Sequence, residues 1–241
     1  HPREHQELEA IAAAWCGASS VREDIDWNRM QPAENQWNFD SFDFTVDTFE
    51  DKAANKTALR QRLLLRDEHK PIVAYIGRLD RQKGMDMVRH GIFRSLEKGA
   101  QFVLLGSSTE QGINAAFWSI KNHYNDNPDL HLELGYNEEL AHLIYAGADI
   151  LIVPSLFEPC GLTQMIAMRY GTVPVVRAVG GLVNTVFDRD HSEEPEEKRN
   201  GYVFHQSDNL AVESALDRAI GLWFDYAEEF AKLAQNGMRA D

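Results

Sequence analysis

The chain has 241 residues, of which 44% are hydrophobic and 26% are charged, and its formal net charge is -14 at pH 7. These values are typical of a soluble globular protein with room for one large core or two small ones. The acidic balance argues against nucleic acid and anionic membrane surfaces as main partners. No apolar run approaches the roughly 20 residues that span a bilayer. Cys16 and Cys160 are far apart in the sequence, which favours free thiols over a disulfide framework.

The first 70 residues are irregular apart from one predicted helix. This helix runs from about Asp51 to Leu65, and we expect its Lys and Arg side chains on the outer face. From residue 71 to about 220, apolar strand patterns alternate with helical patterns. Strands are predicted at 71–76, 101–105, 130–134, 149–153, 173–176 and 201–204. The alternation predicts an α/β fold with a parallel, doubly wound sheet, so we divide the chain into residues 1–70 and a sheet domain over residues 71–241.

A basic loop follows the first predicted strand. Its sequence is Gly77-Arg-Leu-Asp-Arg-Gln-Lys-Gly84, and a helical pattern begins at Met85. Arg78 has a planar fork that grips phosphate oxygens, and Lys83 supplies a compact point charge. Together they are suited to hold a diphosphate and to stabilise it as a leaving group. The alternative is that both are solvated loop charges.

A lone carboxylate follows the fourth predicted strand. The stretch Ser155-Leu-Phe-Glu-Pro-Cys-Gly-Leu-Thr-Gln164 places Glu158 between this strand and a helix that opens after Gly161. Open α/β sheets bind their ligands at the carboxyl edge of the strands. The free N–H groups of the following helix suit a phosphate in the same space. The alternative is that Glu158 only caps that helix.

Three stretches in this order closely resemble the C-terminal half of plant starch synthases and bacterial glycogen synthases. They are residues 77–84, residues 157–164, and Arg169-Tyr-Gly-Thr-Val-Pro-Val-Val-Arg177 followed by Gly180-Gly-Leu182. The region from Asp188 to Phe204, with its acidic insert, looks more like the plant soluble starch synthases. Residues 24–37 resemble the linker of the family, with Asp24 where the family has Gly.

The resemblance implies the second of two Rossmann-like domains in a GT-B glycosyltransferase. In this family, glucose passes from ADP-glucose to the nonreducing end of an α-1,4-glucan with retention of configuration, and no metal or other cofactor is required. Arg78 and Lys83 would bind the diphosphate, and Glu158 would hydrogen-bond glucose and favour an oxocarbenium-like centre. These three are the expected catalytic residues. The expected substrate-binding residues are Tyr136 (stacked on adenine), Cys160, Gly161, Leu162, Thr163, Gly180 and Gly181.

Several of these residues have structural alternatives. Tyr136 would otherwise pack in its loop, and Cys160 is better explained as a small packing residue than as a nucleophile. Gly180 and Gly181 would otherwise only permit close packing.

The resemblance also sets expectations for the whole protein. The Lys-x-Gly-Gly-Leu motif of the family's N-terminal domain has no counterpart, so we expect a chain that begins inside a longer protein and is inactive alone. Two other functions stay open: a non-catalytic nucleotide-sugar or glucan binding module, and a UDP-glucose-dependent retaining transferase of the sucrose synthase type. The expected location is the plastid for a plant protein and the cytoplasm for a bacterial one.

Overall fold

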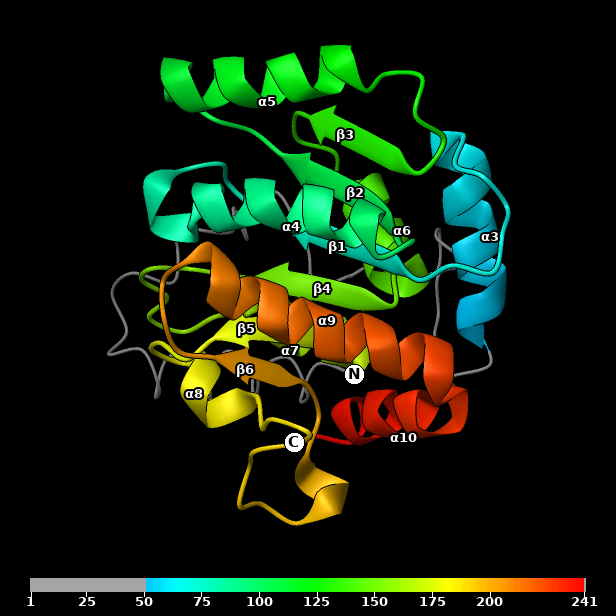
Figure 1. Cartoon of the computed structure of the whole chain (residues 1–241), viewed down its shortest axis with the longest axis vertical. Helices are drawn as coiled ribbons and strands as arrows, with labels where there is room; N and C mark the ends of the chain where they lie inside the picture. The colour runs from blue at the N-terminus through cyan, green and yellow to red at the C-terminus, as the bar shows by residue number, and fades with distance from the viewer. Residues whose placement is uncertain (1–50, 241) are drawn as a thin grey trace, which may run out of the picture.

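A parallel β-sheet forms the centre of the protein in a computed structural model, which describes residues 51–240. The sheet of this part of the chain has six strands in the order β3-β2-β1-β4-β5-β6 (Figure 1). The strands are β1 (Ile72–Ile76), β2 (Gln101–Gly106), β3 (Leu130–Leu134), β4 (Ile150–Val153), β5 (Val173–Arg177) and β6 (Tyr202–Phe204). The predicted strands and the doubly wound parallel fold are therefore confirmed. The strand order reverses between β1 and β4, which makes this pair the topological switch point.

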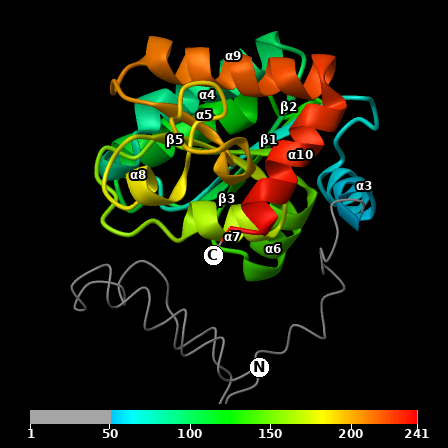
Figure 2. The ribbon, with the colours of Figure 1, turned by 90° about the horizontal axis from the view of Figure 1, so that it is seen from below.

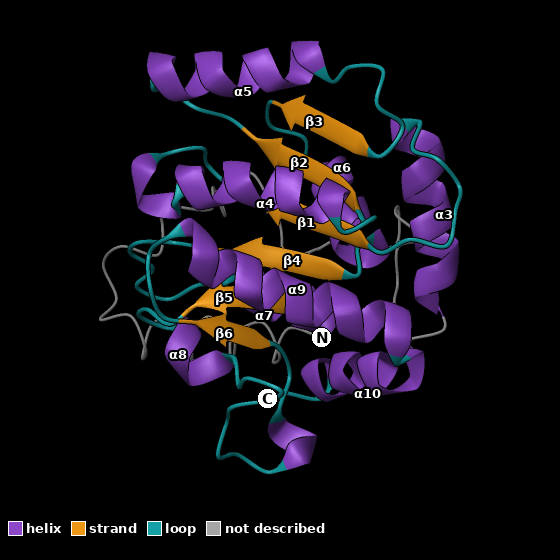
Figure 3. Cartoon of the chain, viewed as in Figure 1, coloured by secondary structure: helices purple, strands orange, loops and turns teal. Residues whose placement is uncertain are grey.

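Helices cover both faces of the sheet. Figure 2 shows α4, α5 and α9 on one side and α6 and α7 on the other, and Figure 3 separates helices, strands and loops by colour. The long helices are α3 (Lys52–Leu63), α4 (Met85–Glu97), α5 (Gln111–His123), α6 (Glu138–Gly147), α9 (Asn209–Asp225) and α10 (Ala227–Met238). The short helices are η3 (Arg81–Lys83), α7 (Thr163–Arg169), α8 (Leu182–Thr185) and η4 (Glu196–Lys198). In the described part of the chain, every helix is too short or too polar to cross a bilayer.

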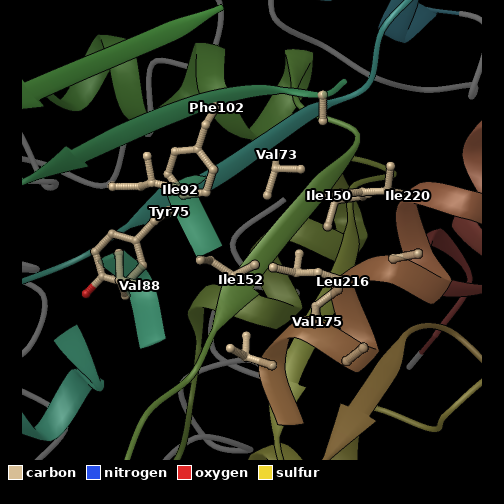
Figure 4. Close-up of a cluster of buried hydrophobic side chains, with 14 of the residues drawn as sticks. Val73, Tyr75, Val88, Ile92, Phe102, Ile150, Ile152, Val175, Leu216 and Ile220 are labelled. Atoms are coloured by element: carbon tan, nitrogen blue, oxygen red, sulfur yellow. The ribbon is translucent and has the colours of Figure 1, made fainter. Parts of the chain in front are cut away.

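The hydrophobic core has one layer on each face of the sheet. On one face, Val73 and Tyr75 of β1 pack with Ile92 of α4 and Leu216 of α9 (Figure 4). On the other face, the alternate β1 residues Ile72 and Ala74 belong to a cluster with residues of α3 and α6. Strands buried on both faces read as continuous apolar runs, which explains why the strands could be recognised in the sequence.

Two basic side chains of α3 contradict the prediction that they lie on its outer face, whereas Arg62 is exposed as predicted. Lys52 and Arg60 are buried. Lys52 Nζ donates hydrogen bonds to the Ala146 carbonyl at 3.0 Å, the Tyr170 carbonyl at 2.9 Å and the Thr172 hydroxyl at 2.9 Å. Ala146 lies in the last turn of α6 and Tyr170 caps the end of α7. Carbonyls at helix C-termini lack partners within the helix and favour a cation, so Lys52 satisfies the ends of two helices at once.

Two further basic residues continue this row along α3 at spacings of four. Lys56 pairs with Asp149 at 2.7 Å. Arg60 donates from Nε to the Gln101 side chain at 2.9 Å and from Nη2 to the Lys70 carbonyl at 2.9 Å. Residues spaced by four share one helix face, so this row attaches α3 to the sheet domain alongside the apolar contacts of Leu59 and Leu63.

Some predictions fall on residues that the structure does not describe. The irregular region, the linker-like residues 24–37 and Cys16 all lie within residues 1–50, outside the described range. The division of the chain near residue 70 therefore stays a prediction. Cys160 is disulfide-bonded, so the prediction of a free thiol at this position is wrong. Distance along the sequence does not limit disulfide pairing, because folding brings distant residues together.

The burial of Lys52 is expected to make the free energy of unfolding depend on pH. Burial lowers the pKa of Lys52 from 10.5 to about 7, against the opposing effect of Asp149. Below pH 7 both states carry the proton, and the cost of burying the charge is fully present. Between about pH 7 and 10.5 the unfolded chain binds the proton that the folded chain has lost, so stability rises with pH.

We therefore expect the free energy of unfolding of the wild type, relative to Lys52→Met, to increase by about 2 kcal/mol between pH 7 and pH 9. Guanidinium unfolding at each pH measures this difference, and the variant serves as the control for all other titrating groups. A difference that stays flat or falls would show that Lys52 keeps its charge in the folded protein.

Candidate functional site

The candidate site lies where the loops after β1 and β4 meet. These two strands are hydrogen-bonded neighbours, with Val73 opposite Ile150 and Ala74 opposite Leu151. Their carboxyl ends point to the same edge of the sheet, at the switch point of the strand order (Figure 1). This is the position where doubly wound sheets bind ligands.

The loop after β1 is held by hydrogen bonds to the sheet beneath it. The Tyr75 hydroxyl donates to the Arg78 carbonyl at 2.7 Å, and the Leu79 amide donates to the Ser107 carbonyl at 2.7 Å. Burial raises the pKa of Tyr75 well above its ordinary value, so its hydroxyl keeps the proton that it donates. Asp80 accepts from the Lys83 amide at 3.1 Å and caps the short helix η3. These contacts fix the backbone from which the Lys83 side chain projects.

Lys83 and Glu158 form an ion pair between the two loops. Lys83 Nζ lies 2.7 Å from Glu158 Oε2, and the two side chains are 16% and 9% exposed. The Ser155 hydroxyl donates to the same Oε2 atom at 2.8 Å. Within residues 51–240, neither hydrogen bond goes to Glu158 Oε1. One carboxylate oxygen is therefore used to fix the side chain, and the other takes part in neither of these two contacts.

This geometry decides two of the structural alternatives. Glu158 does not cap the helix that follows, because α7 has its N-cap at Leu162 and receives no side-chain cap. Lys83 is not a solvated loop charge, because it is mostly buried and paired. The helix-cap alternative is therefore wrong for Glu158, and the solvated-loop alternative is wrong for Lys83 but is not decided for Arg78, whose side chain is 54% exposed.

The backbones of the two loops also bind each other directly. The Leu156 amide donates to the Gln82 carbonyl at 2.6 Å, next to Lys83. Gly84 has φ +72°, and a Cβ atom at this position would overlap the Pro154 carbonyl oxygen. Only glycine combines this conformation with such a close approach. The loop that carries Lys83 and the loop that carries Glu158 are therefore fixed relative to each other.

A third loop, which follows β5, packs against the backbone of Glu158. The Gly181 amide donates to the Glu158 carbonyl at 3.1 Å. A Cβ atom at Gly180 would overlap the Glu158 carbonyl oxygen, and one at Gly181 would overlap the Cys160 carbonyl oxygen. The interpretation of this glycine pair as a close-packing device is supported. Glu158 is thus held through its side chain by one loop and through its backbone by another.

The other predicted site residues lie along the same sheet edge. Cys160, Gly161, Leu162 and Thr163 follow Glu158 directly, and Thr163 is the first residue of α7. Tyr136 comes after β3 and is 72% exposed.

Arg78 is the most exposed member of the predicted catalytic set. Its side chain is 54% exposed and lies 3.6 Å from Asp80. The structure brings Glu158 into direct contact with Lys83 and with the glycine pair, whereas Arg78 and Tyr136 are largely exposed.

Two residues of this site were present in the recognised motifs without a predicted role. Ser155 orients Glu158, and the signal for it was a hydroxyl three residues before the carboxylate. Arg177, the last residue of β5, donates to the Ser155 and Leu156 carbonyls at 3.3 Å each. No group of three or more His, Cys, Asp or Glu side chains that could hold a metal ion occurs among residues 51–240.

Similarity to known proteins agrees with this arrangement. The family model described as Glycosyl transferases group 1 matches residues 56–237. Glycogen synthase 1 of Trichormus variabilis is 59% identical over 224 residues, which is 92% of this chain and 45% of that protein. Glycogen synthase 1 of a Synechococcus strain, JA-2-3B'a(2-13), is 64% identical over 199 residues, 82% of this chain and 40% of that protein. The chain belongs to the group 1 glycosyl transferase family.

A solved structure extends the comparison to the fold. The catalytic domain of starch synthase IV from Arabidopsis thaliana, bound to ADP and acarbose, superposes with a TM-score of 0.79 at 40% identity. The match covers 90% of this chain and 44% of that one, and the chain spans about half the length of the curated relatives that it matches. The resemblance to starch and glycogen synthases is confirmed. The expected closer likeness to plant enzymes is not supported, because the identities with the bacterial enzymes, 59% and 64%, exceed 40%.

The packing of Gly180 against Glu158 predicts a large effect of a small substitution. Gly180 has φ +52°, so Gly180→Ala introduces backbone strain as well as the overlap with the Glu158 carbonyl. We expect it to lower the free energy of unfolding by about 2 kcal/mol or more. Guanidinium unfolding followed by circular dichroism measures the change.

Gly221→Ala is the matched control for this substitution. Gly221 lies within α9, and a Cβ atom there would meet nothing within 4 Å. Removing a helical glycine is expected to raise stability by about 0.5–1 kcal/mol. Equal effects of the two substitutions would contradict the close packing at Glu158.

Proposed function

We propose that the chain is the nucleotide-sugar-binding part of a glucan synthase, a hexosyltransferase. It would hold ADP-glucose while glucose is transferred, with retention of configuration, to the nonreducing end of an α-1,4-glucan. The observation that carries this proposal is the Lys83–Glu158 ion pair at the switch point of the sheet, which places a cation and a carboxylate side by side. The similarity to glycogen synthases and to a starch synthase whose structure contains ADP supports the same reaction.

The proposed chemistry follows from the charges of these residues. Lys83 and Arg78 bind the diphosphate and neutralise the negative charge that builds on ADP as it departs. Glu158 is fixed through Oε2 and presents Oε1 to the glucose, where it accepts a hydroxyl hydrogen and favours positive charge at the reacting carbon. Arg78 is the more exposed of the two cations, with 54% of its side chain accessible. No metal or organic cofactor enters this scheme.

The remaining predicted residues surround the proposed donor. The backbone amides of Cys160, Gly161 and Leu162 and the hydroxyl of Thr163 would hold sugar and phosphate oxygens at the start of α7. Tyr136 would stack its exposed ring on the adenine base. Gly180 and Gly181 would bring the backbone of their loop to the donor beside Glu158, because both pack directly against residues 158–160.

The chain matches only part of each relative, and this affects what we propose for the whole protein. The chain spans about half of those relatives, so we propose that elongation needs groups of the kind supplied by their other half, and that the chain alone does not elongate a glucan. We place the protein in the bacterial cytoplasm, because the compared glycogen synthases are bacterial. The relatives give no support to the plastid alternative. Neither a UDP-glucose donor nor a purely binding role is favoured by an observation in this structure.

Binding of ADP by the chain tests the role of Lys83. Charge-assisted hydrogen bonds contribute about 1.5–3 kcal/mol, so Lys83→Ala is expected to weaken ADP binding by that amount in titration calorimetry. Lys232→Ala is the matched control, because Lys232 also pairs with a glutamate, Glu196 at 2.9 Å, on the exposed surface. The control should bind ADP like the wild type. ADP binding that is absent from the folded wild type, or equal in the two variants, would contradict the proposed site.

Glu158→Gln tests whether this carboxylate contacts the sugar. The variant keeps the size of the side chain but loses the charged acceptor. The affinity for ADP-glucose, relative to that for ADP, is expected to fall about tenfold, which corresponds to about 1.4 kcal/mol. ADP lacks glucose, so its binding should be unchanged or slightly stronger once Lys83 has lost its partner. Parallel calorimetric titrations with both nucleotides measure the ratio, and an unchanged ratio would remove Glu158 from the sugar site.

A further inference from the structure

Arg177 makes an unusual set of contacts at the edge of the candidate site. Its Nη1 atom donates to the Ser155 and Leu156 carbonyls at 3.3 Å each. Its Nε atom is buried and has no hydrogen-bond partner, and no ion pair with a carboxylate is found for it within the described range. Buried arginines normally pair with carboxylates. The cation of Arg177 is instead directed at two backbone oxygens of a single turn.

This turn connects β4 to Glu158 and is held from two sides. On one side the Leu156 and Phe157 amides donate to the Gln82 carbonyl at 2.6 Å and 3.4 Å. On the other side Arg177 binds the carbonyls. Because Gln82 holds the amides and Arg177 holds the carbonyls, loss of either contact leaves the turn attached on one side only.

The turn also determines where Glu158 points. Ser155, whose carbonyl Arg177 binds, donates its hydroxyl to Glu158 Oε2 at 2.8 Å. A hydrogen bond from a charged donor is stronger than one between neutral groups at the same geometry, and Arg177 supplies such a donor to the turn. Arg177 binds the turn and does not pair with Glu158, so the carboxylate keeps its ion pair with Lys83.

We propose that Arg177 is a positioning residue for the donor site: it holds the Ser155–Leu156 turn and thereby fixes the Glu158 carboxylate opposite Lys83. This inference rests on the proposed function for the part that concerns the sugar. The attachment of the turn can be measured without any nucleotide, which keeps the two claims separate.

Amide hydrogen exchange in the chain without ligand gives the first measurement. Arg177→Leu is expected to speed the exchange of the Leu156 and Phe157 amides by about tenfold or more, with the Val175 amide of β5 changed less than about twofold. Arg177→Lys keeps a cation that can reach a carbonyl, so it should fall between the leucine variant and the wild type. Exchange at Leu156 and Phe157 that matches the wild type in both variants would overturn the proposal.

Arg199→Leu is the matched control, because it also removes an arginine that binds two backbone carbonyls. Arg199 donates to the Glu194 carbonyl at 2.8 Å and to the Arg189 carbonyl at 3.0 Å, away from the candidate site. This variant should leave exchange at Leu156 and Phe157 unchanged. If it accelerates these amides as much as Arg177→Leu does, the effect is general and the proposal fails.

The second measurement is the ratio of the affinities for ADP-glucose and ADP. In Arg177→Leu this ratio should fall about tenfold with ADP binding little changed, and Arg177→Lys should restore part of it. A purely structural role would lower both affinities together, and that result would overturn the proposal. If the wild type itself binds neither nucleotide, the proposed function fails, and hydrogen exchange alone decides whether Arg177 holds the turn.

Discussion

Lys83 and Glu158 are 75 positions apart in the sequence, and their side chains meet at 2.7 Å between the loops that follow β1 and β4. A carboxylate and an ammonium this far from water are stable only when each has a partner, so the position of each loop depends on the other. The Ser155 hydroxyl adds a second donor to the same oxygen. The pair therefore cross-links the two loops through Oε2, and in our proposal the other carboxylate oxygen accepts a hydrogen bond from the donor sugar. The candidate site and the stability of the sheet edge are consequences of the same contact.

Close packing of the loop backbones fixes this contact between the two loops. Gly84 permits the first loop to approach Pro154, and Gly180 and Gly181 permit the third loop to approach Glu158 and Cys160. In each case a Cβ atom would occupy the space of a carbonyl oxygen. Loops at a switch point hold their binding groups in precise positions only when neighbouring structure fixes the loops. Here the neighbours are the loops themselves, together with Arg177 at the end of β5.

The sheet could be predicted from the sequence because its strands are buried on both faces. Runs such as Ile150–Val153 stay apolar without interruption, and the polar loop segments between them mark the strand ends. The position of Glu158 at the carboxyl edge followed from the same pattern. The identity of its partner did not, because a contact over 75 positions depends on how two loops fold against each other. Tyr136 is 72% exposed, and the apolar pattern that marks the strands gives no information on the role of an exposed ring.

The burial of basic residues of α3, by contrast, could not be predicted from the sequence. Lys52, Lys56 and Arg60 form a polar row that favours a solvated face, since charged residues usually lie outside. The structure buries Lys52 because the carbonyl ends of α6 and α7 meet at one place and need donors there. That need arises from the packing of three helices, and no local pattern in the sequence expresses it.

The central claim is that the donor binds at the Lys83–Glu158 ion pair. Mapping where ADP-glucose contacts the chain tests it most directly. Titration of the isotopically labelled protein, followed by backbone amide chemical shifts, reports each contacted region separately. We expect the largest shifts at residues 78–84, at residues 158–163 and at Gly180 and Gly181. Shifts that gather instead around Arg189, Arg218 and Tyr226, which line a separate cavity of about 400 Å³, would contradict it.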